Sequence, residues 1–347
     1  MTTSHRWQFD AYNTPAEALA WCPQALAEPG PGQVLLKILA VGMNRSEFNY
    51  VQGNYAPARA FPSGIGQEAV GEILAIGPAA VDGPQPHAKT PLTVGSRVAL
   101  LPGRVDMCEM GTYSDVGLFD QAALAPVPDT YTDAEAAGLW MGVLTMAGAL
   151  ELAGITPQSA KGKTVLITAA SSSMGVIGLK LAKTWGATTI ASSRSAAKAE
   201  QLAAFCDHTI VADDSDSLIA GVADVTDKAG FDAALDPVGQ AFYPGLIQGA
   251  ATGASIISYE MITGREPILP IPLMMMKDLT LRGYTIFRPY RVPGLLTQII
   301  DWGMAYADQI KPIVAGTRSL SEAPKALEEL GRCEHLGKLV LTSNSTN

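Results

Sequence analysis

Residues 163–198 contain the segment whose residue types and spacing could most clearly do chemistry. A β-branched apolar run at 165–167 leads into a loop of small residues, and the loop opens a helical pattern that continues to Trp185. Small residues let a backbone approach a pyrophosphate, and a helix N-terminus offers unpaired N–H groups and a positive dipole end. The pattern predicts the first βαβ unit of a dinucleotide-binding fold. The loop residues expected to bind the cofactor are Ser171, Ser172, Ser173, Met174 and Gly175.

The loop departs from the G-x-G-x-x-G pattern of such units. Ala169, Ser171 and Ser172 stand where glycines are common, and Gly175 and Gly178 are the glycines that this loop and helix retain. The alternative interpretation is an ordinary tight strand-to-helix turn in an α/β protein that binds no nucleotide.

The residues after the second strand of this unit indicate which dinucleotide it would bind. That strand is expected at 187–191, and NAD-binding folds usually place an acidic residue at its end for the ribose 2′-hydroxyl. This chain has Ser193 and Arg194 there, with Lys198 one turn further on. Because a guanidinium and an ammonium suit a 2′-phosphate better, the sequence predicts NADPH as the cofactor.

The elements around this segment change character near residue 130. Residues 1–130 are β-rich, with strands expected at 34–41, 68–76 and 97–101 and an exposed loop at 77–95. A capping box from Thr132 to Glu135 opens a helix, and strands and helices then alternate through residue 258. The fold class is therefore α/β, a β-rich domain plus a doubly wound parallel sheet. Crossover handedness would place residues 171–173 and 193–194 on one carboxyl edge of that sheet.

The composition excludes several classes of function. A chain of 347 residues with 48% hydrophobic and 16% charged residues is expected to form about two compact domains. A net charge of −9 without a basic cluster argues against nucleic acid or an anionic membrane as partner. The four cysteines are far apart, so no disulfide framework or ribbon-type zinc site is expected. Without a secretory segment or a long apolar run, a cytoplasmic protein is expected.

Short motifs along most of the chain are each weak alone, but their joint order and spacing are specific. They are Gly42-Met-Asn-Arg-Ser-Glu47, Gln52-Gly-Asn-Tyr55, Gly66-Gln-Glu-Ala-Val-Gly71, Val94-Gly-Ser-Arg-Val98, Gly142-Val-Leu-Thr145, the 169–175 loop, Asp236-Pro-Val-Gly239, Leu279-Thr-Leu-Arg-Gly283 and Leu336-Gly-Lys-Leu-Val340. In these motifs the chain resembles the medium-chain dehydrogenase/reductase superfamily, specifically its zinc-free quinone oxidoreductase and enoyl reductase branch.

The resemblance implies a domain organisation and a homodimer. It implies a GroES-like substrate domain over 1–130, completed by 289–347, and a Rossmann NADPH-binding domain over 131–288. It also implies that residues 278–288 extend the sheet across a homodimer. The alternating character of these residues independently indicates an edge strand, although a strand covered within the monomer is the alternative.

The residues at the zinc positions of related alcohol dehydrogenases do not suit a metal. The resemblance places Asn44 or Arg45 where those enzymes carry a cysteine and Gln67 where they carry a histidine. Zinc needs about three donors drawn from thiolate, imidazole and carboxylate, so no bound metal is expected and Glu68 is taken as a buried structural acid. Without a Lewis acid, the expected substrate is a quinone or a carbonyl-activated C=C bond (enone, enal or enoyl ester), whose anion hydrogen bonds can hold.

The resemblance and the residue types together give four further site residues. By resemblance, Tyr55 is the proton donor or orienting hydroxyl, and Thr145 contacts the nicotinamide. Asn44 can donate and accept at once, which suits the nicotinamide ribose or a substrate carbonyl. Asp236 closes the fourth strand of the parallel sheet at the cofactor edge. The alternatives are a surface tyrosine, a threonine buried in a helix and a turn asparagine.

These observations together predict an NADPH-dependent, zinc-independent oxidoreductase that acts on a small conjugated carbonyl compound or a quinone. Two other functions stay open at this point. One is a zinc-type alcohol dehydrogenase with unusual ligands, and the other is a non-catalytic NADPH-binding or redox-sensing protein.

Overall fold

The computed structural model describes residues 2–80, 87, 92–264 and 266–343. The chain divides into two compact units. We call Met1–Met141 with Lys311–Asn347 the terminal unit, and Gly142–Ile310 the middle unit. The boundaries expected at 130/131 and 288/289 fall earlier in the chain than this division. Residues 289–310 belong to the middle unit because they form helices that pack with it, as α12 (Ala307–Ile310) does with α5 (Ser173–Thr184).

The terminal unit is built on a seven-stranded sheet in the order β15-β16-β3-β5-β6-β8, with β7 paired to β3. Strand β3 (Gln33–Gly42) is central because its nearly continuous apolar run is mostly buried, and it pairs antiparallel with β5, β7 and β16. The other strands are β5 (Ala69–Ile76), β6 (Arg97–Leu100), β7 (Val116–Asp120), β8 (Leu124–Ala125), β15 (Val314–Ser319) and β16 (Lys338–Thr342). The strands expected at 34–41, 68–76 and 97–101 are confirmed within two residues.

A second, three-stranded sheet of the terminal unit, which was not predicted, has the order β2-β1-β4. It consists of β1 (Thr2–Phe9), β2 (Ala20–Leu26) and β4 (Ser63–Gly64). The helices of this unit are α1 (Pro15–Ala18), α2 (Arg45–Val51), α3 (Asp133–Ala137) and α13 (Ala323–Arg332). One apolar core joins both ends of the chain, since Phe9, Ile38, Leu327 and Leu341 are all buried in it. The capping box predicted from Thr132 to Glu135 is present at the start of α3.

The middle unit is a parallel sheet of six strands in the order β11-β10-β9-β12-β13-β14. The chain fills one side first, through β9 (Thr164–Ile167), β10 (Thr188–Ser193) and β11 (His208–Val211), and then crosses β9 to begin the other side. The strands of the other side are β12 (Phe231–Asp236), β13 (Ala250–Ser258) and β14 (Thr280–Gly283). The order therefore reverses between β9 and β12, the place where doubly wound folds bind ligands.

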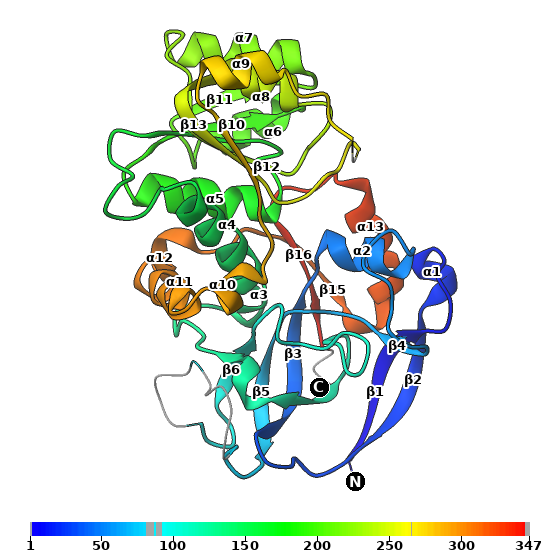
Figure 1. Cartoon of the computed structure of the whole chain (residues 1–347). Helices are drawn as coiled ribbons and strands as arrows, with labels where there is room; N and C mark the ends of the chain where they lie inside the picture. Colours follow the sequence, from blue (N-terminus) through cyan, green and yellow to red (C-terminus); the bar gives the residue numbers. More distant parts are fainter. Residues whose placement is uncertain (1, 81–86, 88–91, 265, 344–347) are drawn as a thin grey trace. The chain divides into compact units, whose positions relative to one another are not determined.

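Helices cover both faces of this sheet (Figure 1), which confirms the doubly wound architecture. One face carries α7 (Ser215–Val225), α8 (Tyr243–Gly249) and α9 (Ile271–Met276), and the other carries α4 (Trp140–Leu152), α5, α11 (Leu295–Ala305) and α12. Helix α6 (Ala196–Leu202) follows β10, and α10 (Arg288–Arg291) follows β14. The core between sheet and helices consists of buried aliphatic and aromatic side chains such as Leu166, Leu218, Phe231 and Leu246.

Predictions were also made for the strand within 278–288, for the loop at 77–95 and for membrane-spanning segments. The strand expected within 278–288 is confined to Thr280–Gly283, and it lies at the edge of the sheet, as its alternating pattern indicated. Most of the loop expected at 77–95 lies outside the described residues, including Gly83, Pro84 and Pro86. None of the helices that the structure describes combines the length and the apolar character needed to span a bilayer.

Candidate functional site

The loop between β9 and α5 is a tight turn that leads directly into a serine-capped helix. Ser172 caps α5, because its Oγ accepts the backbone N–H of Gly175 at 3.0 Å. A Cβ on Gly175 would lie 2.5 Å from the carbonyl oxygen of Ala170, so only glycine lets the helix start this close to the loop. Ala169 adopts a φ of 45°, the left-handed conformation that glycine would favour at this place. Alanine therefore reproduces the turn of the glycine-rich pattern at some cost in backbone strain.

The end of β10 lies beside this loop on the same edge of the sheet. β9 and β10 are adjacent parallel strands with Ile167 opposite Ala191, and the N–H of Ala170 donates to the carbonyl of Ser192 at 2.9 Å. The expectation that the serine loop and residues 193–194 share one carboxyl edge is therefore confirmed. Arg194 is exposed at this edge.

A short turn connects Ser193 to the helix that carries Lys198. The buried Ser193 Oγ accepts the N–H of Ser195 at 3.2 Å, and the Ser195 Oγ accepts the N–H of Lys198 at 3.4 Å. Residues 193–198 thus form one hydrogen-bonded turn with Arg194 in it. A phosphorylated ribose would suit three groups of this turn, namely the Ser193 hydroxyl, the exposed Arg194 guanidinium and the half-buried Lys198 ammonium.

Asp236 joins the ends of β9 and β12 where the strand order reverses. Its carboxylate is buried, accepts a short hydrogen bond from the Thr168 hydroxyl and accepts the N–H of Gly239 at 2.8 Å. Burial raises the pKa of Asp236 to about 6, although these hydrogen bonds oppose the shift. The carboxylate therefore holds the 236–239 turn to β9 instead of facing solvent. Thr145, the other expected contact of this unit, is buried within α4 at 6% exposure.

The terminal unit contains a buried polar cluster around Asn44, which we call the Asn44 cluster: Asn44, Glu47, Glu68, Tyr113 and Lys338. The Lys338 ammonium donates to the Asn44 Oδ1 at 2.7 Å and makes a short ion pair with Glu68. The Asn44 Nδ2 lies 3.2 Å from both the Gly42 carbonyl and the Glu68 Oε1. The second carboxylate oxygen of Glu68 accepts the N–H of Met141 at 2.9 Å.

Glu47 forms the other half of the cluster. It is fully buried and accepts the N–H of Asn44 at 2.8 Å, the Tyr113 hydroxyl at 2.9 Å and the N–H of Gln67 at 3.1 Å. Burial raises the pKa of Glu47 to about 7, against the lowering effects of the hydrogen bonds and of Lys338. Burial likewise raises the pKa of Tyr113 well above its usual value. One cation therefore compensates two carboxyl groups in the interior of this unit.

This cluster does not fit a zinc ion. Among the residues that the structure describes, no three His, Cys, Asp or Glu side chains gather as a ligand set. Gln67, at the position expected for an imidazole, donates its Nε2 to the Ser46 hydroxyl at 3.1 Å. The Glu68 carboxylate is engaged by the Lys338 ammonium, whose positive charge disfavours a divalent cation beside it. Glu68 is buried, as expected, and is paired with Lys338.

Tyr55 lies apart from this cluster in the segment that follows α2, and its side chain is 41% exposed. The terminal unit therefore presents Tyr55 at its surface while Asn44 is 7% exposed. Lys338, Glu47 and Tyr113 were not among the predicted site residues. The available signal was a lysine directly before the apolar run Leu339–Leu341, because a buried lysine needs a partner for its charge.

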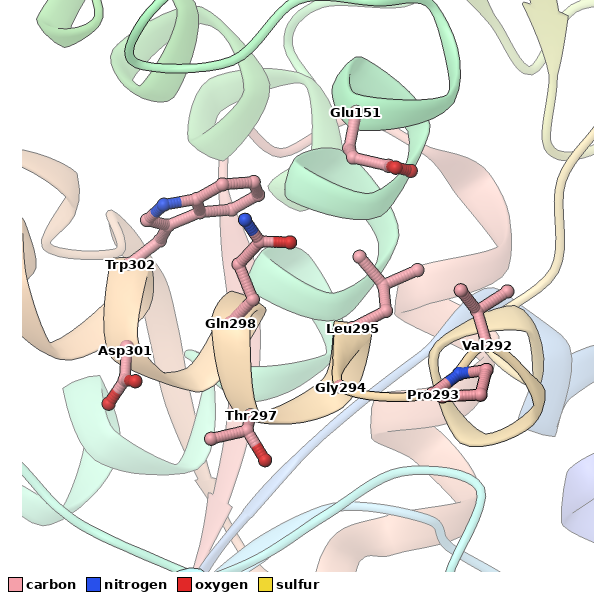
Figure 2. A pocket seen from close by; sticks show the side chains of 9 residues that line it. All are labelled: Glu151, Val292, Pro293, Gly294, Leu295, Thr297, Gln298, Asp301 and Trp302. Carbon is pink, nitrogen blue, oxygen red and sulfur yellow. The ribbon is translucent and has the colours of Figure 1, made fainter.

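The middle unit also has a groove of about 840 Å³, shown in Figure 2. It lies along α11 and contains none of the predicted site residues. Its lining residues are Glu151, Val292, Pro293, Gly294, Leu295, Thr297, Gln298, Asp301 and Trp302. At its margin Glu151 forms a close ion pair with Arg288.

Comparison with known proteins identifies both units. Residues 30–131 match the alcohol dehydrogenase GroES-like domain family, and residues 173–301 match the zinc-binding dehydrogenase family. A quinone oxidoreductase of Pseudomonas aeruginosa is 26% identical over 97% of this chain and 98% of its own length. An acryloyl-coenzyme A reductase of Metallosphaera sedula is 25% identical over 91% of this chain and 94% of its own.

A solved structure extends the likeness to three dimensions. The quinone oxidoreductase of Pseudomonas syringae pv. tomato DC3000 is 26% identical, covers 98% of this chain and 99% of its own, and superposes with a TM-score of 0.81. The similarity therefore includes the GroES-like unit, the parallel sheet and the connection of both chain ends into one unit. On these grounds the chain belongs to the medium-chain dehydrogenase/reductase superfamily.

Proposed function

We propose that this protein is an NADPH-dependent, zinc-independent oxidoreductase that transfers hydride to a quinone or to a carbonyl-activated C=C bond. The observation that carries the proposal is the carboxyl edge of β9 and β10. There a serine-capped helix start, closed on the loop by Gly175, lies beside the turn that carries Arg194. We take the helix start as the diphosphate site and Arg194 as the ligand of a 2′-phosphate, since both follow adjacent parallel strands at one edge of the sheet.

The class of acceptor rests on the relatives and on the Asn44 cluster. The relatives named above are quinone oxidoreductases and an acryloyl-coenzyme A reductase. The Lys338–Glu68 ion pair supports reduction without a metal, because it occupies the carboxylate next to Gln67. Quinones and conjugated carbonyl compounds need no Lewis acid, since their anions delocalise onto oxygen atoms that hydrogen bonds can hold.

Bound NADPH would supply the hydride from C4 of its nicotinamide ring. An acceptor reduced in this way would gain a C–H bond at its β-carbon, and its C=C electron pair would move toward the carbonyl to leave an enolate. Tyr55 is our proposed partner for this anion, because its side chain is 41% exposed and a phenol hydroxyl can donate a hydrogen bond to the oxygen or a proton to the α-carbon. Thr145 is proposed to contact the nicotinamide ring.

The hydrogen bonds of the Asn44 side chain limit which further hydrogen bonds this residue can make. Its Nδ2 protons face the Gly42 carbonyl and the Glu68 carboxylate, and Lys338 occupies one lone pair of Oδ1. The Asn44 side chain also faces the backbone N–H of Glu47 in the capping box of α2, although that N–H donates to the Asn44 main-chain carbonyl at 3.1 Å. Because both Nδ2 protons are engaged, we propose that Asn44 accepts a hydrogen bond at Oδ1 from a hydroxyl of the nicotinamide ribose, and not that it donates one to the substrate carbonyl.

We also propose a homodimer through residues 278–288. β14 is the edge of the parallel sheet, and the backbone groups on its outer side can pair with a second copy. Helix α9, which precedes β14, exposes Met275 at 76% and Met276 at 83%. Two exposed methionines beside an open edge support an interface between copies of this chain.

The test of the function is turnover with the purified protein. NADPH and NADH are supplied in turn with a panel of quinones, 2-alkenals and enoyl thioesters, and bound metal is measured in the same sample. We expect NADPH oxidation with at least one acceptor, unaffected by a chelator. Activity that a chelator abolishes and zinc restores would favour a zinc-type alcohol dehydrogenase. Tight NADPH binding without turnover would favour a redox-sensing role.

A further inference from the structure

The segment that carries Tyr55, residues 53–61, is held by contacts from outside itself. It follows α2 and contains no helix or strand. Its first turn is anchored to α2, because the N–H of Gly53 donates to the Tyr50 carbonyl at 3.1 Å and that of Asn54 donates to the Asn49 carbonyl at 2.8 Å. Its last part is anchored to the 106–109 turn, since the Cys108 thiol donates to the Ala60 carbonyl at 3.3 Å.

The part of the segment around Tyr55 is held by Tyr12, a residue 46 positions from its partner Ala58. The Tyr12 hydroxyl accepts the backbone N–H of Ala58 at 2.7 Å, three residues after Tyr55. The Tyr12 ring also lies against Gly53, two residues before Tyr55, where an added Cβ would be 3.0 Å from the ring Cγ. Gly53 has a φ of 74°, so the turn that brings it to this ring requires glycine. Tyr12 therefore brackets Tyr55 on both sides along the chain.

A cluster of aromatic rings fixes Tyr12 itself. Its ring centroid lies 5.4 Å from that of Phe61 and 6.0 Å from that of Phe9. Phe9 in turn packs edge-to-face on Tyr50 at 5.4 Å, and the Tyr50 hydroxyl shares a 2.7 Å hydrogen bond with Ser63. Phe9 and Tyr50 are buried in the core of the terminal unit. The position of the Tyr12 hydroxyl is thus defined by the core, and the hydroxyl transmits that position to residue 58.

We propose that Tyr12 is a positioning residue that holds the 53–61 segment so that the Tyr55 hydroxyl meets the acceptor. The inference rests on the proposed function. It adds a residue outside the motifs of the sequence analysis, contributed by the chain between β1 and α1. Tyr12 acts through Tyr55 and has no contact with the reacting atoms of its own.

Steady-state kinetics with NADPH and the best acceptor of the panel test the proposal. Tyr12→Ala removes both the ring and the acceptor of the Ala58 N–H, and it should lower kcat by about tenfold or more with an unchanged KM for NADPH. Tyr12→Phe keeps the ring and should lower kcat by only about two- to threefold. Trp21→Ala is the matched control. Trp21 lies in β2, its exposure of 38% is close to the 39% of Tyr12, and its ring contacts are with His5 and Trp7.

The same changes in a Tyr55→Phe background separate positioning from general stabilisation. If Tyr12 acts through Tyr55, Tyr12→Ala should lower kcat by less than about twofold in that background. Hydrogen exchange gives a readout independent of turnover. The Ala58 amide should exchange faster in Tyr12→Phe, which lacks the acceptor hydroxyl, and its exchange rate should be unchanged in Trp21→Ala.

Each outcome decides between the inference and the function on which it rests. A Tyr12→Ala enzyme with the kcat of Trp21→Ala, or equal losses in both backgrounds, would overturn the positioning role while the proposed function stands. Full activity of Tyr55→Phe would overturn the role of Tyr55, and the positioning role with it. Slower turnover together with faster exchange at Ala58 supports the inference.

Discussion

Replacing Lys338 by methionine tests the Asn44 cluster most severely. The side chains of Lys338 and Glu68 are 1% and 2% exposed, so the change leaves a carboxylate in the interior without its counter-charge. Methionine preserves most of the volume of the stem, and the perturbation is therefore mainly electrostatic.

The expected loss in the free energy of unfolding depends on the hydrogen bonds that Glu68 retains in the variant. Removing one partner of a buried ion pair typically costs about 3–5 kcal/mol, because the remaining charge is uncompensated. Glu68 retains the N–H of Met141 at 2.9 Å and the Asn44 Nδ2 at 3.2 Å, so we expect a loss near the lower end, about 3 kcal/mol. Adding Glu68→Gln should recover part of that loss, since the unpaired charge is removed.

The assay is denaturant unfolding followed by hydrogen exchange of the peptide 33–42, which reports on the terminal unit through β3. Lys37→Met is the matched control, because Lys37 is an exposed lysine of β3 in the same unit. This replacement should change the free energy of unfolding by less than about 0.5 kcal/mol. Equal unfolding free energies for Lys338→Met and Lys37→Met would refute the view that Lys338 compensates Glu68.

Three further predictions address the remaining features. The pKa of Glu47 is raised to about 7 in the folded protein, whereas its ordinary value is 4.5. Between these two pH values the folded protein keeps a proton on Glu47 that the unfolded chain releases. The free energy of unfolding should therefore fall by up to about 3 kcal/mol as the pH rises from 4.5 to 7. Urea midpoints across pH 4.5–8 measure this, and Glu47→Gln should flatten the slope. Gly175→Ala should weaken NADPH binding by about tenfold or more in calorimetry, because its Cβ would meet the Ala170 carbonyl, whereas Gly249→Ala, with ordinary contacts there, should not. Met275→Glu with Met276→Glu should convert a dimer to a monomer in sedimentation velocity, and an unchanged sedimentation coefficient would contradict the proposed interface; Val94→Glu is the exposed control.

The parts of the fold that could be predicted from sequence are those whose residues interact locally. About 20 residues contain β9, the small-residue loop and α5 in direct succession. The residue types of this stretch therefore suffice to predict the strand, the turn and the helix. The capping box of α3 joins residues three apart and was predicted for the same reason. Even the departure from the glycine pattern was visible, although the left-handed φ of Ala169 was not.

The contacts that could not be predicted join residues far apart in the chain. Lys338 lies 294 positions from Asn44 and 270 from Glu68, and nothing in its local pattern names these partners. Tyr12 and Ala58 are likewise distant, and the β1–β2 pair lacks a tight two-residue turn that would have indicated a hairpin. The second division of the units, after Ile310 and not after residue 288, depends on how α10–α12 pack, which periodicity alone does not specify.

We propose that the turn at Ser193 and Arg194 binds the 2′-phosphate of NADPH beside the serine loop. Calorimetric titration of the wild-type protein and of Arg194→Ala with NADPH and with NADH tests it directly. We expect the wild type to bind NADPH more tightly than NADH. In the variant this preference should fall by about tenfold or more, since a charge-assisted hydrogen bond contributes about 1.5–3 kcal/mol. Equal affinity of the wild type for the two dinucleotides, or an unchanged preference in Arg194→Ala, would contradict it.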